Sequence, residues 1–202
     1  ERLLLDMAPH YDRKRFEIAH CNLFDRTGGG GPFPAGLRAT GLTYYGIGAG
    51  GWAQAPRAVA QLAAMLRRER FDIVHLHMLH ATLTGGLVRA LGSGPRFVAT
   101  KHYTRGLVRQ PLLRWIDRRI TARLDRVIAI SRWVAQDLRA GGVSDKVIRL
   151  VYNGLDLSAF EPAGPRCPTN RGTNQPGPWI GTVGNLHPRK GHADLMHAFA
   201  LV

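Results

Sequence analysis

Cysteine and lysine are scarce in this 202-residue chain, and long apolar runs are absent. The two cysteines, Cys21 and Cys167, form neither a disulfide framework nor the spacing of a metal site, although a single bridge between them stays open. No apolar run approaches the roughly 20 residues of a bilayer-spanning helix, and the opening apolar stretch is too short for a signal peptide. These absences exclude disulfide-rich secreted proteins and integral membrane proteins. A cytoplasmic location is predicted.

The positive charge is carried almost entirely by arginine. Of 28 basic residues only four are lysines, and the formal net charge is +14. One interpretation is attraction to phosphate, either of nucleic acid or of an anionic membrane surface. The other is codon bias in a GC-rich genome, which would place the arginines on a solvated surface. The charge alone does not choose between the two.

Short β-branched runs alternate with amphipathic stretches along most of the chain. Strands are predicted at 16–23, 42–48, 72–77, 96–102, 126–131 and 147–154. Helices are predicted at 56–70, 81–91, 111–124 and 132–142, with a loop at 27–36. Strands that alternate with helices indicate a parallel sheet covered on both faces, that is, a Rossmann-like α/β fold. The continuous apolar character of the strands agrees, because such strands are buried on both sides.

The composition changes after residue 158. Residues 159–178 are rich in proline, glycine and small polar residues and have no periodicity, which is typical of a linker. A new strand and helix are predicted within 179–202. The sequence therefore predicts a first domain at 1–158, a linker at 159–178 and the start of a second domain at 179–202. No internal repeat is present.

Histidines mark the end of one predicted strand. In the segment VHLHMLH, His75 and His77 share one face of the strand, and His80 follows. In open parallel sheets ligands bind at the carboxyl ends of strands. Three interpretations are open for these histidines: a metal site, a cleft-lining role or plain packing.

The next strand ends in VATKHYTRG. Lys101, His102, Tyr103 and Arg105 provide several hydrogen-bond donors where the strand passes into a loop. This set is suited to contacting a substrate. A solvated loop with no ligand explains the same residues equally well.

The segment TVGNLHPRKGH, which begins at Thr182, combines a glycine turn with the start of a helix. Cations are disfavoured at a helix start, where unpaired N–H groups carry partial positive charge. Arg189 and Lys190 are explained if an anion binds there, and Gly184 and Gly191 permit a close approach of the backbone. The segment matches neither a Walker loop nor G-x-G-x-x-G. It is interpreted as a phosphate site.

The predicted helix 111–124 has apolar residues at every fourth position and arginines on the other side. A basic amphipathic helix can lie on an anionic membrane surface. It can equally be a surface helix whose apolar stripe packs on the sheet, which is the more common arrangement.

Five motifs in this order resemble the family 4 glycosyltransferases of the GT-B fold. The motifs are FDIVHLH, VATKH, RVIAIS, LVYNGLDLSAFEP and VGNLHPRKGHADLMHAF. The resemblance covers nearly the whole chain. It implies a retaining sugar transfer from a nucleotide-sugar donor to a saccharide or lipid-linked acceptor, for instance in cell-surface polysaccharide biosynthesis. It also implies no obligatory metal and no other cofactor.

The resemblance also implies roles for individual residues. The family pattern G-R-L-x-x-x-K-G aligns with Gly184, Asn185, Leu186, Lys190 and Gly191, so Lys190 is expected to contact the donor diphosphate. Asn185 departs from the pattern, which has arginine there, and Arg189 is a candidate replacement. His102 matches a histidine beside the donor sugar. The matching cleft and turn positions are His77, Lys101, Tyr103, Ser131 and Asn153. Ser131 is also predicted to cap a helix, and Asn153 to form a turn.

The match implies that a first strand with a Gly-Gly loop would lie before residue 1, and that the family's Glu-x7-Glu motif would lie beyond residue 202. Residues 1–202 alone are therefore not expected to catalyse transfer. A lipid-linked acceptor would favour peripheral association with the inner face of the cell membrane. The alternative function is a non-catalytic basic α/β domain that binds nucleic acid or another polyanion. The chain contains no nucleic-acid-binding motif, so no nucleic-acid partner is predicted.

Overall fold

The computed structural model divides the chain into two compact units, Glu1–Asp156 and Leu157–Val202, close to the predicted domain end at residue 158. The structure describes residues 2–25, 30–50, 52–92, 94–102, 110–157 and 180–201. Among these residues, no helix is long and apolar enough to cross a membrane.

The elements of the first unit alternate as the sequence predicts. In chain order they are α1 (Arg2–Met7), η1 (Ala8–His10), β1 (Ala19–Asn22), α2 (Pro32–Ala39), β2 (Thr43–Gly46), η2 (Trp52–Gln54), α3 (Ala55–Glu69), β3 (Ile73–His77), α4 (Met78–Ala90), β4 (Arg96–Lys101), α5 (Pro111–Thr121), β5 (Arg126–Ala129), α6 (Arg132–Ala140) and β6 (Ile148–Leu150). The second unit contains η5 (Pro188–Lys190) and α7 (His192–Phe199).

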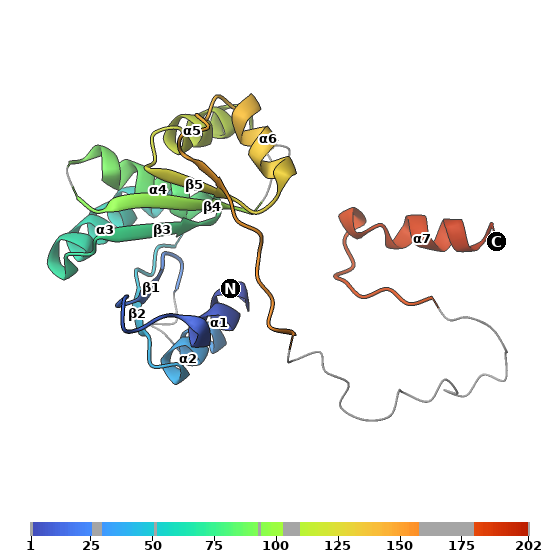
Figure 1. Ribbon diagram of the computed structural model, residues 1–202, viewed down its shortest axis with the longest axis horizontal. Coiled ribbons are helices and arrows are strands. Elements are labelled where there is room, and N and C mark those ends of the chain that lie inside the picture. The colour runs from blue at the N-terminus through green and yellow to red at the C-terminus, as the bar shows by residue number, and fades with distance from the viewer. Residues whose placement is uncertain are drawn as a thin grey trace. The chain divides into compact units, whose positions relative to one another are not determined.

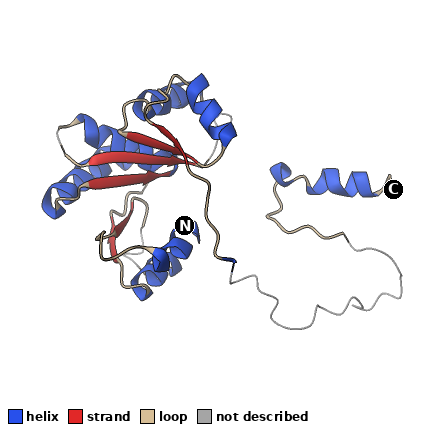
Figure 2. Ribbon diagram, viewed as in Figure 1, coloured by secondary structure: helices blue, strands red, loops and turns tan. Residues whose placement is uncertain are grey.

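All strand pairs are parallel, and they form two sheets. One sheet has the order β3-β4-β5-β6, and the other pairs β1 with β2 (Figures 1 and 2). Crossovers between parallel neighbours are almost always right-handed, so α4, α5 and α6, which join successive strands of the larger sheet, cover one of its faces. Parallel sheets with helices on both faces confirm the Rossmann-like fold class. The α2 helix packs on β2 in the smaller sheet.

The larger core lies between the four-stranded sheet and its helices. It contains Phe97 and Val127 from the strands, Leu62 from α3 and Leu138 from α6. Leu23, just after β1, belongs to the same core, so the two sheets share one apolar interior. A second, smaller cluster contains Ala8, Phe33, Leu37 and Leu42.

Helix α3 illustrates how local sequence fixes an element. A proline occupies its first turn, where the missing N–H costs nothing. Its buried side chains recur at helical spacing: Ala58, Leu62, Ala63, Met65 and Leu66. The helix ends where Arg70 adopts a left-handed conformation with φ +55° and its N–H donates to the Leu66 carbonyl at 3.1 Å.

A predicted loop and a predicted strand were wrong. Residues 32–36 belong to α2 rather than to a loop, because Pro32 begins a helix and its buried positions include Phe33 and Leu37. The strand predicted from residue 179 does not form in the described part, since residues 180–187 pair with no other strand. A strand needs a neighbour for its backbone hydrogen bonds, and the described residues of the second unit offer none.

Candidate active site

Three histidines gather at the carboxyl edge of the four-stranded sheet. His75 and His77 lie on β3, and His102 directly follows β4. In the parallel register His77 lies opposite Thr100, so the ends of the two strands bring His77 and His102 together. Alternation along the strand places His75 and His77 on one face. This edge of a parallel sheet is where ligands bind in open α/β folds.

The three imidazole rings form a continuous stack. The ring centroids of His75 and His77 are 4.3 Å apart, and those of His77 and His102 are 5.5 Å apart. His77 Nδ1 and His102 Nε2 share a hydrogen bond of 3.2 Å, and His75 Nε2 is 2.7 Å from the Thr100 hydroxyl. Because one imidazole must donate and the other accept, each ring of the His77–His102 pair fixes the tautomer of its partner.

The environment keeps these histidines uncharged at neutral pH. Burial, with a smaller effect of the neighbouring His75 and His102, lowers the pKa of His77 to about 3. Burial also lowers the pKa of His75, as does the proximity of His102. The pKa of His102 is lowered chiefly by burial. The site therefore offers neutral imidazoles, which can accept or donate a hydrogen bond without carrying charge.

The metal interpretation of the histidines has no support in the geometry. Among the described residues, no group of three His, Cys, Asp or Glu side chains is placed to hold a metal ion. His80 lies apart from the stack and packs edge-on against Phe24, with ring centroids 4.9 Å apart.

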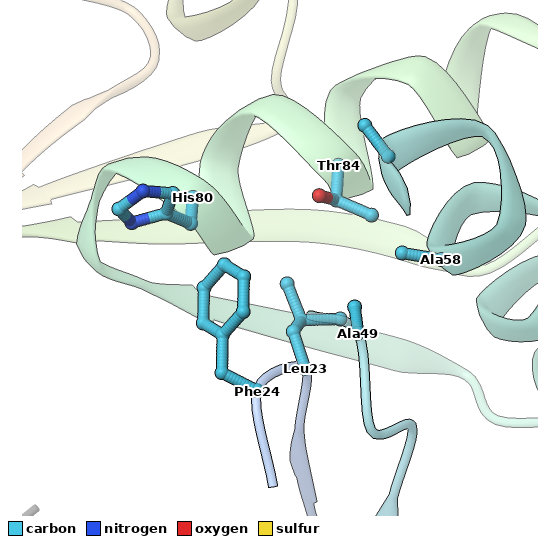
Figure 3. Close-up of a pocket in the computed structure, with 7 residues that line it drawn as sticks. Leu23, Phe24, Ala49, Ala58, His80 and Thr84 are labelled. Atoms are coloured by element: carbon cyan, nitrogen blue, oxygen red, sulfur yellow. The ribbon is translucent and has the colours of Figure 1, made fainter. Parts of the chain in front are cut away.

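The first unit also contains a small, largely apolar pocket. It is built where the segments after β1 and β2 meet α3 and α4 (Figure 3). The residues that line it are Leu23, Phe24, Ala49, Ala55, Ala58, His80 and Thr84. Its empty volume is about 280 Å³, with an opening to solvent.

Lys101 points away from the histidine stack. Alternation along β4 places Lys101 on the helix-covered face, opposite Thr100. Its ammonium donates to Asp117 Oδ1 on α5 at 2.7 Å, and the two side chains are only 4% and 13% exposed. Burial lowers the pKa of Lys101, while the Asp117 carboxylate opposes that shift. The geometry assigns this pair to the packing between β4 and α5.

In the second unit, a tight turn brings the predicted phosphate-binding residues together. The Lys190 N–H donates to the His187 carbonyl at 2.8 Å, and Gly191 adopts φ +68° to begin α7. The His192 ring lies 3.1 Å from the Asn185 carbonyl, and a side chain on Gly184 would come within 3.5 Å of that ring. The Lys190 side chain is exposed, so its charge faces solvent.

The family model Glycosyltransferase Family 4 matches residues 1–159, most of the chain. The chain belongs to this family. No curated protein matches the chain. The match covers the unit that carries the histidine stack, so the stack and the pocket lie within a glycosyltransferase-type domain.

The other predicted positions of this family 4 domain fall in different places. Ser131 caps α6, with its Oγ accepting a hydrogen bond from the Val134 N–H at 3.2 Å, so the predicted cap is confirmed. Asn153 is exposed and lies in residues 151–156, which form neither helix, strand nor turn. Neither Asn153 nor Gly154 has a positive φ, so the predicted turn was wrong. Tyr103, Arg105 and Cys167 lie outside the described residues, as does the Arg189 side chain.

Sequence reasoning missed three contacts in this family 4 chain. Thr100 is the hydrogen-bonding partner of His75, Asp117 holds Lys101, and His192 holds the Asn185 carbonyl. Strand alternation could have separated Lys101 from His102 in advance, because consecutive residues face opposite sides. The role of Asp117 was not predicted, because helix 111–124 was interpreted from its apolar residues and its arginines.

Proposed function

We propose that the intact protein transfers a sugar from a nucleotide-sugar donor to a saccharide or lipid-linked acceptor, with retention of anomeric configuration. The observation that supports this most directly is the neutral, hydrogen-bonded His77–His102 pair at the carboxyl edge of a family 4 domain. The reaction needs no obligatory metal in this proposal, and its setting is the cytoplasmic synthesis of a cell-surface polysaccharide.

His102 is the proposed contact to the donor sugar. Its Nε2 is engaged by His77, so Nδ1 is the ring nitrogen that we assign to a sugar hydroxyl. Glycosyl transfer passes through an oxocarbenium-like transition state with positive charge on the sugar. A protonated imidazole beside that sugar would repel the developing charge, whereas a neutral one does not. The lowered pKa of His102 therefore suits this role.

Lys190 is the proposed contact to the donor diphosphate. Negative charge grows on the diphosphate as the glycosyl bond breaks, and a fixed cation stabilises that charge. The turn that presents Lys190 is formed by Gly184, Asn185 and Gly191. Arg189, the residue before Lys190, is the proposed second cation. These donor-binding roles rest on the family pattern, which the turn geometry supports.

The acceptor is assigned to the carboxyl edge of the sheet. His77 lies at this edge, and Tyr103, Ser131 and Asn153 remain predicted contacts. Lys101 is not among the proposed acceptor contacts, because its buried ammonium is hydrogen-bonded to Asp117. A lipid-linked acceptor would place the protein at the inner face of the membrane.

A transfer assay tests the proposal. We expect the intact protein to release nucleoside diphosphate from one of a panel of uridine- and guanosine-diphosphate sugars when saccharide or lipid-linked acceptors are present. His102→Ala should lower kcat on the order of 100-fold. The matched control is His197→Ala on the exposed surface of α7, which should leave kcat unchanged. Equal rates for the two variants would contradict the assignment of His102.

The alternative function, a non-catalytic domain that binds nucleic acid or another polyanion, rests on net charge alone. No feature of the described residues favours it, and we do not propose it.

A further inference from the structure

The first turns of α5 and α6 expose large apolar side chains. Leu112 is 69% exposed, Trp115 is 56% exposed and Trp133 is 70% exposed. The inner side of α5 is formed by other residues, since Asp117 and Thr121 are buried against the sheet. We call Leu112, Trp115 and Trp133 the tryptophan surface. These side chains are not needed for packing within the described structure.

Helices α5 and α6 lie side by side on the same face of the sheet. They join β4 to β5 and β5 to β6, and right-handed crossovers place both on one face. The Arg118 guanidinium donates to the Gly141 carbonyl at 2.9 Å, which links the C-terminal ends of the two helices. Figure 1 shows the two helices. Both helices begin at the carboxyl ends of strands. The tryptophan surface is therefore on the edge of the sheet that holds His77 and His102.

Arginines accompany the tryptophan surface on both helices. The exposed arginines of α5, of the turn after it and of α6 are Arg114, Arg119, Arg123, Arg132 and Arg139, the last of which pairs with Asp145. The Arg119 guanidinium lies over the Trp115 ring, 5.5 Å from its centroid. The two acidic residues of these helices do not offset this charge at the surface, because Asp117 is buried with Lys101 and Asp137 is half-buried. The exposed side of α5 and α6 is thus both apolar and cationic.

We propose that the tryptophan surface docks the protein on an anionic phospholipid bilayer. Tryptophan is enriched at the level of lipid headgroups because its ring is apolar and its N–H is polar. The arginines beside the rings complement the phosphates of lipid headgroups. The exposed leucine favours a membrane over nucleic acid, because an apolar side chain can be buried among lipid chains and gains nothing from a phosphate. The inference deepens the proposed function and rests on it in one respect: docking would bring a lipid-linked acceptor to the sheet edge that holds His77 and His102.

Vesicle binding tests the proposal without any sugar substrate, so its outcome is independent of the transfer assay. The intact protein should co-sediment at low salt with vesicles that contain phosphatidylglycerol and should bind pure phosphatidylcholine vesicles far more weakly. Replacing both Trp115 and Trp133 by alanine should weaken partitioning on the order of tenfold or more. The control is Leu91→Ala, which removes an equally exposed apolar side chain after the far end of α4.

The arginines are tested separately. Arg114→Gln combined with Arg132→Gln should weaken partitioning roughly 25-fold, since each basic residue near the surface contributes roughly fivefold. Arg57→Gln combined with Arg67→Gln removes the same charge from α3 and should have little effect. Far-ultraviolet circular dichroism checks that each variant remains folded.

Three results would overturn the proposal. The first is equal binding to neutral and anionic vesicles. The second is anionic-vesicle binding that survives the double tryptophan replacement. The third is binding to a single-stranded oligonucleotide, lost in the same variants, with no binding to vesicles; that result would assign the surface to nucleic acid.

Discussion

The carboxyl edge of the sheet and the turn before α7 carry the two sets of residues proposed to contact the donor, and they are built in opposite ways. At the sheet edge, His77 and His102 are partly buried, hydrogen-bonded to each other and neutral. At the turn, Lys190 is exposed on a short 3-10 helix that ends at a left-handed Gly191. Packing therefore orients the first set, and backbone conformation presents the second.

Charge is distributed differently in the two regions. The described core of the first unit holds a buried cation, Lys101, on the face of β4 opposite the histidines, where Asp117 compensates it. The histidines on the other face are themselves neutral. The two regions therefore differ in charge: the sheet edge is neutral, and the turn is positive.

The largest expected effect comes from breaking the buried ion pair. Asp117→Asn leaves the Lys101 ammonium in the interior without its counter-charge, and loss of one partner of a buried pair typically costs about 3–5 kcal/mol. We expect the free energy of unfolding in urea to fall by about that amount. Lys101→Met combined with Asp117→Asn should recover part of the loss. An Asp117→Asn variant as stable as the wild type would show that the pair is not buried as described.

The next largest effect is on the turn. Lys190→Ala in the intact protein should raise the activation barrier by about 3 kcal/mol, because a fixed cation near the leaving diphosphate is lost. The measurement is kcat for nucleoside diphosphate release. Lys146→Ala removes an exposed lysine from the first unit and is the matched control. Full turnover in Lys190→Ala would remove the turn from the proposed donor site.

The neutrality of the stack predicts a pH dependence of stability. The pKa of His77 is lowered to about 3, so as pH falls below about 6.5 the unfolded chain takes up the proton first. The free energy of unfolding should therefore be highest above that pH and should decrease on acidification, by about 1 kcal/mol per pH unit for His77. Urea unfolding between about pH 7.5 and 5 measures this slope. His77→Phe should reduce the slope, and His197→Phe should not.

The smallest effect concerns the cap beside the site. Ser131→Ala removes the acceptor of the Val134 N–H and should lower the free energy of unfolding by about 1 kcal/mol. Ser131→Asp should restore most of this loss, since aspartate is an equally good N-cap. If Ser131→Ala also abolished transfer while stability changed little, Ser131 would have a direct role at the cleft.

Periodicity made most of the fold predictable. Helix 56–70 and strand 96–102 correspond to Ala55–Glu69 and Arg96–Lys101, because amphipathic spacing and continuous apolar runs reflect burial directly. The helix at Pro32–Ala39 was missed because its glycines and prolines are typical of a loop. Its stability comes from burying Leu37 against residues distant in sequence, which no local pattern shows.

The candidate site was predictable only in outline. Strand ends alone indicated that His77 and His102 would lie at one edge. The hydrogen bond between them depends on strand register, and the capture of Lys101 by Asp117 depends on how α5 packs on β4. Neither register nor helix packing can be read from one sequence.

The main proposal is that His102, which is neutral and hydrogen-bonded to His77, contacts the donor sugar. The most direct test is nitrogen-15 NMR of the imidazole groups in the intact protein at about pH 7, before and after addition of the nucleotide-sugar that is active in the transfer assay. Signals are assigned with His77→Phe and His102→Gln. We expect both rings to give the signals of neutral imidazole. The His102 signal should shift when the donor binds, and the His197 signal should not. A protonated pair, or a His102 signal that ignores the donor, would contradict the proposal.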